Sequence, residues 1–155
     1  MKTFTILGTG WLGFELAKAF KDDYLIKASS RNEEKIKMYE EEGFSSYILN
    51  ENNLDFLDEL LNTNYLFVNF PPSKFDDYLG FLEKIYSHKK IKNIEKIIFI
   101  SSTSIYPNIE GFLDEDFKIE DSSSKIVFEA ENLVLNRSDI IFRVSALVGA
   151  NRVSG

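Results

Sequence analysis

Three glycines near the start of the chain, spaced G-x-G-x-x-G, restrict the possible folds more than any other feature of this sequence. They are Gly8, Gly10 and Gly13. The short apolar run 3–7, which is rich in β-branched residues, precedes them and predicts a buried strand. An amphipathic helix is predicted next, with one apolar stripe made of Leu12, Leu16, Ala19 and Phe20. This order of strand, turn and helix is typical of a dinucleotide site, whereas the alternative is an ordinary glycine-rich turn.

Each glycine has its own physical role in a dinucleotide site. Gly8 permits the tight turn out of the strand, and Gly13 lets the helix lie close to the sheet. Gly10 has no side chain, so a pyrophosphate can approach the backbone. The free N–H groups at the start of the helix carry a partial positive charge that favours phosphate. We therefore expect Thr9, Trp11 and Leu12 to contact the nucleotide together with the three glycines.

Apolar strands and amphipathic helices alternate along the rest of the chain. Further strands are predicted at 24–29, 44–49, 64–70, 96–101 and 139–144. Helices are predicted between them, opening at Asn32, at Asn52 or Asn53, at Ser73 and at about Ser123. This alternation predicts one α/β domain over 1–155, a doubly wound parallel sheet with helices on both faces. Right-handed crossovers give the strand order 3-2-1-4-5-6 of the NAD(P)-binding Rossmann fold.

The composition excludes several classes of site and partner. The chain has no cysteine, which excludes disulfides and thiolate chemistry, and no metal site is predicted. Its net charge of −7 argues against a nucleic-acid surface, because phosphate backbones favour clustered lysine and arginine. No apolar run reaches membrane-spanning length, and the chain opens on a predicted strand rather than on a signal peptide. We expect a cytoplasmic protein with no membrane partner.

The end of the second predicted strand indicates which dinucleotide to expect. A carboxylate there would bind the ribose 2′-hydroxyl and select NAD. This chain has Ser29, Ser30 and Arg31 instead, which favour the 2′-phosphate of NADP. Additional positive charge is expected from Lys27, Lys35 and Lys37. NAD is the alternative cofactor, and Arg31 could instead form a surface ion pair with Glu33 or Glu34.

Two further segments resemble motifs of one superfamily. The segment 101–106, Ser-Ser-Thr-Ser-Ile-Tyr, is similar to the S-S-x-x-V-Y-G strand end of the short-chain dehydrogenase/reductases, with Pro107 in place of the glycine. The segment 143–149 is similar to their R-x-x-x-x-[YV]-G. Together with the glycine turn, these segments resemble the extended and atypical members, which are NAD-dependent epimerase/dehydratase-like proteins.

The resemblance implies a set of site residues. Ser102 would bind the reacting carbonyl or alcohol, although a strand-end hydroxyl that bonds nearby backbone is the alternative. Lys125 matches the catalytic lysine position, but Asp121 stands where the family has tyrosine four residues earlier, so the usual dyad is incomplete. A solvated helical lysine is the favoured alternative for Lys125. Tyr106 is the candidate substitute. The segment holding Asn69 and Pro71 would line the ribose and nicotinamide side of the cofactor.

The resemblance leaves two functions open. One is an NAD(P)-dependent oxidoreductase or epimerase-like enzyme acting on an unknown small molecule. The other is a dinucleotide-binding module without catalysis, either a redox sensor or a structural partner. Extended members of the superfamily also carry a C-terminal lobe over the substrate, and we expect this chain to lack it. Apolar surface near the last strand would then be exposed, and a homodimer is possible.

Overall fold

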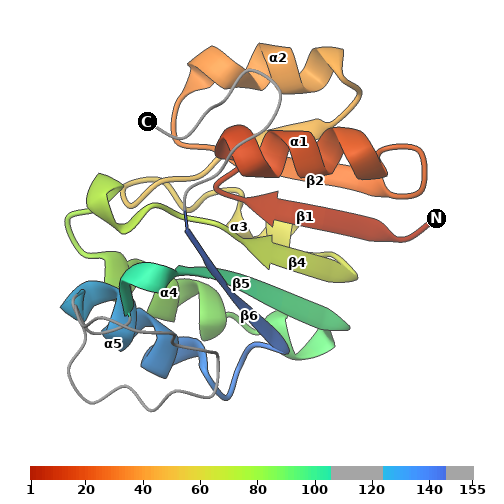
Figure 1. The fold of residues 1–155 in the computed structure, drawn as a ribbon. Helices are drawn as coiled ribbons and strands as arrows, with labels where there is room; N and C mark the ends of the chain where they lie inside the picture. Colours follow the sequence, from red (N-terminus) through yellow and green to blue (C-terminus); the bar gives the residue numbers. More distant parts are fainter. Residues whose placement is uncertain (106–123, 146–155) are drawn as a thin grey trace.

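A parallel sheet forms the middle layer of the molecule (Figure 1). The computed structural model describes residues 1–105 and 124–145. The strands in this part are β1 (Thr3–Leu7), β2 (Leu25–Ser30), β3 (Ser45–Ile48), β4 (Tyr65–Val68), β5 (Lys96–Ser102) and β6 (Ile140–Val144). Neighbouring strands are all parallel, in the order β3-β2-β1-β4-β5-β6. The predicted fold class and strand order are confirmed.

Helices cover the sheet from both sides. They are α1 (Gly10–Phe20), α2 (Ile36–Glu41), α3 (Leu57–Leu61), α4 (Tyr78–Tyr86) and α5 (Lys125–Val134). Short 3₁₀ turns are η1 (Glu33–Lys35), η2 (Pro72–Lys74), η3 (Ile91–Asn93) and η4 (Thr103–Ile105). Figure 1 shows α1 and α2 on one side of the sheet and α4 and α5 on the other. None of the helices in 1–105 and 124–145 has the length and apolar character that crossing a membrane requires.

Two apolar cores lie on the two faces of the sheet. Ile6 and Leu7 are adjacent on β1 and point to opposite faces, yet both are fully buried. Ile6 belongs to the core under α1 and α2, whereas Leu7 belongs to the core under α3, α4 and α5. A central parallel strand covered on both faces has this burial pattern.

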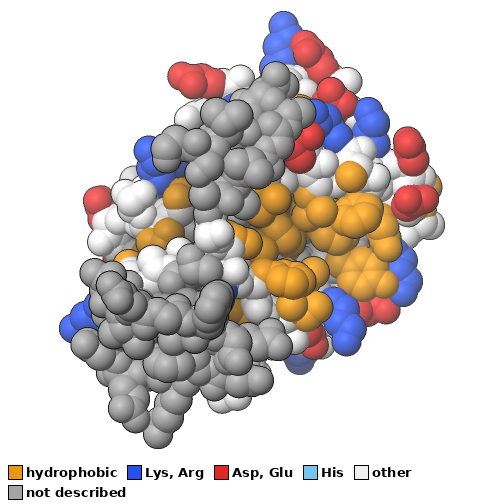
Figure 2. Space-filling model, in the orientation of Figure 1, with side chains coloured by type: hydrophobic (Ala, Val, Ile, Leu, Met, Phe, Trp, Pro, Cys, Tyr) orange, Lys and Arg blue, Asp and Glu red, His pale blue; other side chains and the backbone are white. Residues whose placement is uncertain are grey.

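One half of the sheet is covered less completely. Alternate residues of β5 are buried, but Ile98 and Ile100 are only half-buried. They pair with Ile140 and Phe142 of β6, which are 42% and 51% exposed. Hydrophobic side chains gather over the strands below α1 (Figure 2). The expectation of exposed apolar surface near the last strand is confirmed.

Three helix predictions need correction. The helix expected from Asn52 or Asn53 begins only at Leu57, because Asn50 and Asn53 form a backbone bridge that closes a turn first. Ser73 does not open the next helix, because Pro72–Lys74 forms a 3₁₀ turn and Asp77 caps α4 by accepting a hydrogen bond from the Gly80 N–H. On α1 the fully buried apolar side chain is Ala17, and the predicted core residue Ala19 is exposed.

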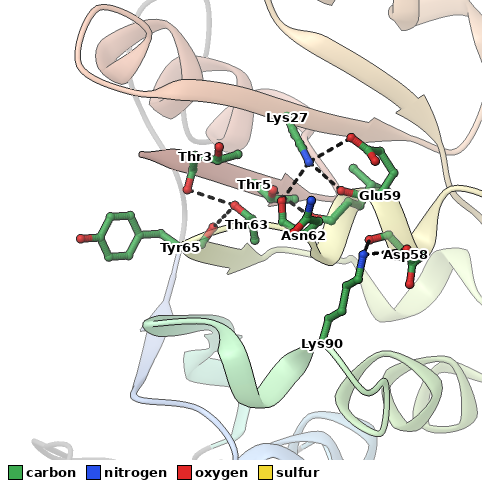
Figure 3. A network of polar contacts seen from close by, with 10 residues as sticks. Thr3, Thr5, Lys27, Asp58, Glu59, Asn62, Thr63, Tyr65 and Lys90 are labelled. Carbon is green, nitrogen blue, oxygen red and sulfur yellow. Dashed lines mark hydrogen bonds and ion pairs between the residues drawn. The ribbon is translucent and has the colours of Figure 1, made fainter. Parts of the chain in front are cut away.

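Lys27 serves the fold rather than the nucleotide site. Its ammonium donates to the backbone carbonyls of Glu59 at 2.7 Å and Asn62 at 2.9 Å, and to the Glu59 carboxylate at 3.2 Å (Figure 3). These carbonyls lie at the C-terminal end of α3, where a cation is favourable. The prediction that Lys27 adds positive charge to the nucleotide site was therefore wrong.

Candidate functional site

The glycine turn between β1 and α1 has the backbone geometry that its sequence predicts. Gly8 has φ +71° and Gly10 has φ +43°, both in the left-handed region that favours glycine. A Cβ on Gly8 would collide with the backbone of Asn69, and one on Gly13 would lie 2.9 Å from Cγ2 of Ile6. A Cβ on Gly10 would have no atom within 4 Å. Gly8 and Gly13 are therefore required for packing, whereas Gly10 faces open space, as the approach of a pyrophosphate demands.

Hydrogen bonds to Ser29 of β2 and to Asn69, the residue after β4, hold this turn in place. The Gly8 N–H donates to Oγ of Ser29 at 2.9 Å, and the Thr9 hydroxyl donates to the Ser29 carbonyl at 2.8 Å. The Asn69 amide donates to the Gly8 carbonyl at 3.3 Å. Thr9 and Ser29 are both 1% exposed. Sequence analysis assigned Ser29 no contact with the turn, because this contact depends on the register between β1 and β2.

The turn opens into a cavity of about 420 Å³ at the carboxyl ends of the strands. All the residues predicted to bind the nucleotide line this cavity except Gly13, namely Gly8, Thr9, Gly10, Trp11, Leu12, Ser30, Arg31, Asn69 and Pro71. Gly13 lies just below, where α1 packs on β1. A cleft at this edge of an open α/β sheet is where ligands of such folds bind.

The charge of the cavity differs in sign from that of the chain. Arg31, Lys35 and Lys74 line it, and none of its described lining residues is a carboxylate. No ion pair holds the Arg31 guanidinium among residues 1–105 and 124–145, so the alternative pairing with Glu33 or Glu34 does not occur there. Asn32 caps the η1 turn by accepting from the Glu34 N–H at 3.2 Å. Lys37 is exposed on α2 and does not line the cavity.

The start of α1 contributes backbone N–H groups to the cavity wall and no negative charge. The first turn of α1 contains no acidic residue, and the Thr9 side chain does not cap it. Gly10, Trp11 and Leu12 of this turn all line the cavity. The backbone N–H groups in the first turn of an α-helix carry a partial positive charge, so this end of the cavity favours an anion.

The cavity continues to the end of β5 and to α5. Ser102 lines it, and its hydroxyl oxygen accepts a hydrogen bond from the Ser104 N–H at 3.1 Å. Val127 and Ala130 are the α5 residues that line it. The side chain of Lys125 is 88% exposed, lies 3.6 Å from the Glu129 carboxylate and does not line the cavity. Tyr106 and Asp121 fall outside the described residues.

Two tyrosines also line the cavity, and both phenols are protonated at neutral pH. Tyr39 and Tyr78 are 1% and 4% exposed. Burial raises the pKa of Tyr39, and burial raises the pKa of Tyr78 far above its ordinary value. The Tyr78 hydroxyl donates to the Phe70 carbonyl at 3.4 Å. Neither phenol can therefore serve as a base without a large change of environment.

A buried polar cluster lies beside this end of the cavity. Glu131 of α5 is 6% exposed and receives hydrogen bonds from Arg143 of β6 and from Ser101 of β5. Ser101 lines the cavity. Sequence analysis singled out neither Glu131 nor Ser101 as a site residue. Within 1–105 and 124–145, no group of histidine and acidic side chains is arranged to hold a metal ion.

Comparison with known proteins gives matches over nearly the whole chain. Protein YeeZ of Escherichia coli K12 is 27% identical over 170 aligned residues, which cover all of this chain and 62% of YeeZ. A Methylobacillus flagellatus protein assigned as an NAD-dependent epimerase/dehydratase superposes with a TM-score of 0.75 at 24% identity. The UDP-glucuronic acid 4-epimerase of Bacillus cereus, solved in complex with NAD, superposes with a TM-score of 0.71 at 18% identity.

The chain has the fold of NAD-dependent epimerases and dehydratases. The superpositions cover 97% and 95% of this chain but only 56% and 57% of those two proteins. No family model matches the sequence. The resemblance indicated by the sequence motifs is confirmed for the fold, and this chain spans little more than half the length of these two proteins.

Proposed function

We propose that this chain binds a nicotinamide dinucleotide and prefers NADP. The pyrophosphate would lie over Gly10 and the first turn of α1, and the 2′-phosphate would lie against Ser30, Arg31 and Lys35. The observation that carries this proposal is a cavity lined by three cationic side chains and, among its described residues, by no carboxylate. In a chain with a net charge of −7, such a cavity favours a phosphorylated ligand.

A nicotinamide cofactor is also supported by the Bacillus cereus epimerase, which was solved with NAD. The preference for NADP over NAD rests on this chain alone. No carboxylate stands at the end of β2, where an NAD-selecting acid would contact the ribose, and Arg31 stands there instead.

The first candidate function is an oxidoreductase or epimerase-like enzyme of the cytoplasm, and its substrate is unknown. The nicotinamide ring would supply or accept a hydride. Ser102 supports this function, because its oxygen already accepts from the Ser104 N–H and its own proton is available for a substrate oxygen. Tyr106 is proposed as the proton donor or acceptor.

The second candidate is a module that binds the dinucleotide without catalysis. It is favoured by the wall that α5 presents to the cavity. Val127 and Ala130 are aliphatic, and Lys125 is exposed on another side of the helix. A lysine that lowers the pKa of a catalytic phenol must lie close to it, and none of the described α5 residues lining the cavity can do so.

Cofactor binding is tested by titrating the chain with NADPH and NADH while following fluorescence of Trp11, the only tryptophan, which lines the cavity. We expect tighter binding of NADPH, and Arg31→Ala should weaken NADPH binding by about tenfold or more with little effect on NADH. Lys37→Ala is the matched control, because it removes a nearby exposed cation outside the cavity. Tighter NADH binding would overturn the NADP preference, and no binding of either would overturn the proposal.

The two candidate functions are separated by turnover. The chain with NADPH is assayed against a panel of carbonyl compounds and nucleotide sugars. Turnover that Ser102→Ala abolishes supports the enzyme. Tight binding without turnover across the panel supports the module.

A further inference from the structure

Glu131 is the only charged side chain that is buried among residues 1–105 and 124–145. Its two carboxylate oxygens accept hydrogen bonds from one residue of β5 and one residue of β6. Arg143 donates from Nη2 to Oε1 at 2.9 Å and from Nε to Oε2 at 3.0 Å. Ser101 donates from Oγ to Oε2 at 2.6 Å. Burying an ion pair is costly unless its hydrogen bonds are satisfied, and here both carboxylate oxygens of Glu131 have donors.

The cluster fixes the direction of the hydrogen bonds that Ser101 can make. A carboxylate paired with arginine only accepts, so the Ser101 proton is committed to Glu131. The remaining capacity of the Ser101 oxygen is that of an acceptor. Ser102 has the opposite hydrogen-bonding role. Its oxygen accepts a hydrogen bond from the Ser104 N–H, so its own proton can be donated to a ligand. Two adjacent serines that both line the cavity therefore offer different groups to a ligand.

Apart from the Glu131–Arg143 pair, the cavity wall around Ser101 is apolar. Phe99, Val127, Ala130 and Val144 line the same end of the cavity. Apolar walls suit a flat ring, and a single fixed acceptor among them selects a ring that carries a hydrogen-bond donor. A dinucleotide that extends from Arg31 across Gly10 would bring its second half to this end.

We propose that Ser101 accepts a hydrogen bond from the carboxamide N–H of a nicotinamide ring, with Glu131 and Arg143 as positioning residues that hold Ser101 as an acceptor. This inference rests on the proposed function, since it assumes that the nucleotide binds in the cavity. It adds a specificity determinant for the nicotinamide half of the ligand.

The test compares NADPH with its 3-acetylpyridine analogue, in which a methyl group replaces the carboxamide NH₂ and the carbonyl remains. Affinities are measured by Trp11 fluorescence. The unmodified chain should bind NADPH about tenfold more tightly than the analogue, which is the effect of one hydrogen bond. Ser101→Ala should reduce this ratio to about one. Ser101→Thr, which keeps the hydroxyl, should retain it.

Three further measurements distinguish an effect at Ser101 from a general effect on binding. Ser46→Ala is the matched control on β3, because it removes a serine hydroxyl remote from the cavity and should leave the ratio unchanged. Glu131→Gln should lower the ratio, since an amide can donate to Ser101 and release the serine proton. Affinity for 2′-phospho-ADP-ribose, which lacks the ring, should be the same in the unmodified chain and in Ser101→Ala.

The possible failures are distinguishable. If NADPH and 2′-phospho-ADP-ribose both fail to bind, the proposed function and this inference are overturned together. If both bind, but the unmodified chain does not discriminate against the analogue, the role of Ser101 is overturned and nucleotide binding stands. The same conclusion follows if Ser101→Ala discriminates as well as the unmodified chain.

Discussion

At the scale of single residues, Gly10 and Gly43 both have a positive φ but lie at different places in the fold. Gly10 has φ +43° in the glycine turn, and Gly43 has φ +90° after α2. A Cβ on either would meet no atom within 4 Å. A side chain at either position would therefore collide with nothing, and would destabilise the fold by about 1 kcal/mol because of the left-handed backbone. Only Gly10 lines the cavity.

Because only Gly10 lies in the cavity, substitutions at the two glycines distinguish an effect on stability from an effect on NADPH binding. Gly10→Ala should lower the free energy of unfolding by about 1 kcal/mol and weaken NADPH binding by about tenfold or more, because the methyl group occupies space that the pyrophosphate needs. Gly43→Ala should cost similar stability and leave NADPH affinity unchanged. Urea denaturation and fluorescence titration measure the two effects. Equal NADPH affinities in the two variants would contradict the placement of the pyrophosphate over Gly10.

The site residues that sequence could predict are those whose role is local. The glycine spacing sets the turn, and the residues at the ends of strands follow from strand order. Ser29 and Glu131 depend on tertiary contacts instead. Ser29 reaches the turn only through the pairing of β1 with β2, and Glu131 meets Ser101 and Arg143 only when α5 packs on β5 and β6. The motifs at 101–106 and 143–149 contain Ser101 and Arg143, but neither motif indicates that both residues contact Glu131.

At the scale of elements, α3 depends on its neighbours. It has five residues, which is too short for a helix to be stable alone. Leu57, Leu60 and Leu61 bury it against the sheet, and Lys27 of β2 binds its C-terminal carbonyls (Figure 3). The cap thus joins a helix to a strand about thirty positions earlier in the chain, as the separation of 32 between Lys27 and Glu59 shows.

Removing the Lys27 cap should loosen α3 without affecting the nucleotide. Lys27→Met keeps most of the side-chain volume and deletes the donors, so we expect a loss of about 1–2 kcal/mol in the free energy of unfolding. Amide hydrogen exchange should become faster in 57–62. NADPH affinity should not change, because Lys27 lies outside the cavity. A selective loss of NADPH affinity would restore the sequence-based assignment of Lys27 to the nucleotide site.

An exposed ion pair links α4 to the segment after α5. Arg137 donates from Nη2 to Glu83 Oε2 at 2.7 Å and from Nη1 to Oε1 at 3.2 Å. The Arg137 guanidinium, with the Ser87 hydroxyl, lowers the pKa of Glu83 from its ordinary 4.5 to about 2. Because the folded-state pKa is depressed, the stabilisation is present above pH 4.5 and is lost as the pH falls towards 2.

The predicted direction of this pH dependence can be tested with a single substitution. Glu83→Gln should lower the urea midpoint at neutral pH, and the difference from the unmodified chain should shrink as the pH falls from about 4.5 to about 2. Glu40→Gln, at an exposed position on α2, should show no such change. A midpoint difference that stays constant over this pH range would show that Glu83 is not ionised against Arg137.

Prediction of elements from sequence succeeded where one signal was dominant. The alternation of apolar strands with helices predicted the strand order of the sheet correctly. The α3 and α4 boundaries were wrong because several start signals compete there. Asn52, Asn53 and Ser73 are all suitable caps, and only the Asn50–Asn53 bridge and the turn at Pro72 decide against them.

At the scale of the whole molecule, the sheet is covered unevenly. The half made by β1, β2 and β3 packs under α1 and α2, whereas Ile140 and Phe142 remain exposed on β6. Ile98 and Ile100, which are half-buried and pair with Ile140 and Phe142, extend this surface onto β5. Such a patch favours association with another apolar surface.

Self-association of the chain should therefore depend on this face. Phe142→Asp places a charge on the patch and should lower the average mass measured by light scattering at high protein concentration. Leu25→Asp is the control, because Leu25 is 57% exposed at the start of β2, away from β6. If both variants change the mass equally, the β5–β6 face is not the surface that associates.

The contacts that hold the glycine turn span very different distances along the chain. Ser29 is 21 positions from Gly8, whereas Asn69 is 61 positions away. Contacts between distant residues require closure of a longer loop and form later during folding. The turn therefore becomes rigid only after the two halves of the sheet have joined at β1 and β4. During refolding, secondary structure should recover first, and the ability to bind nucleotide should appear with the slowest kinetic phase.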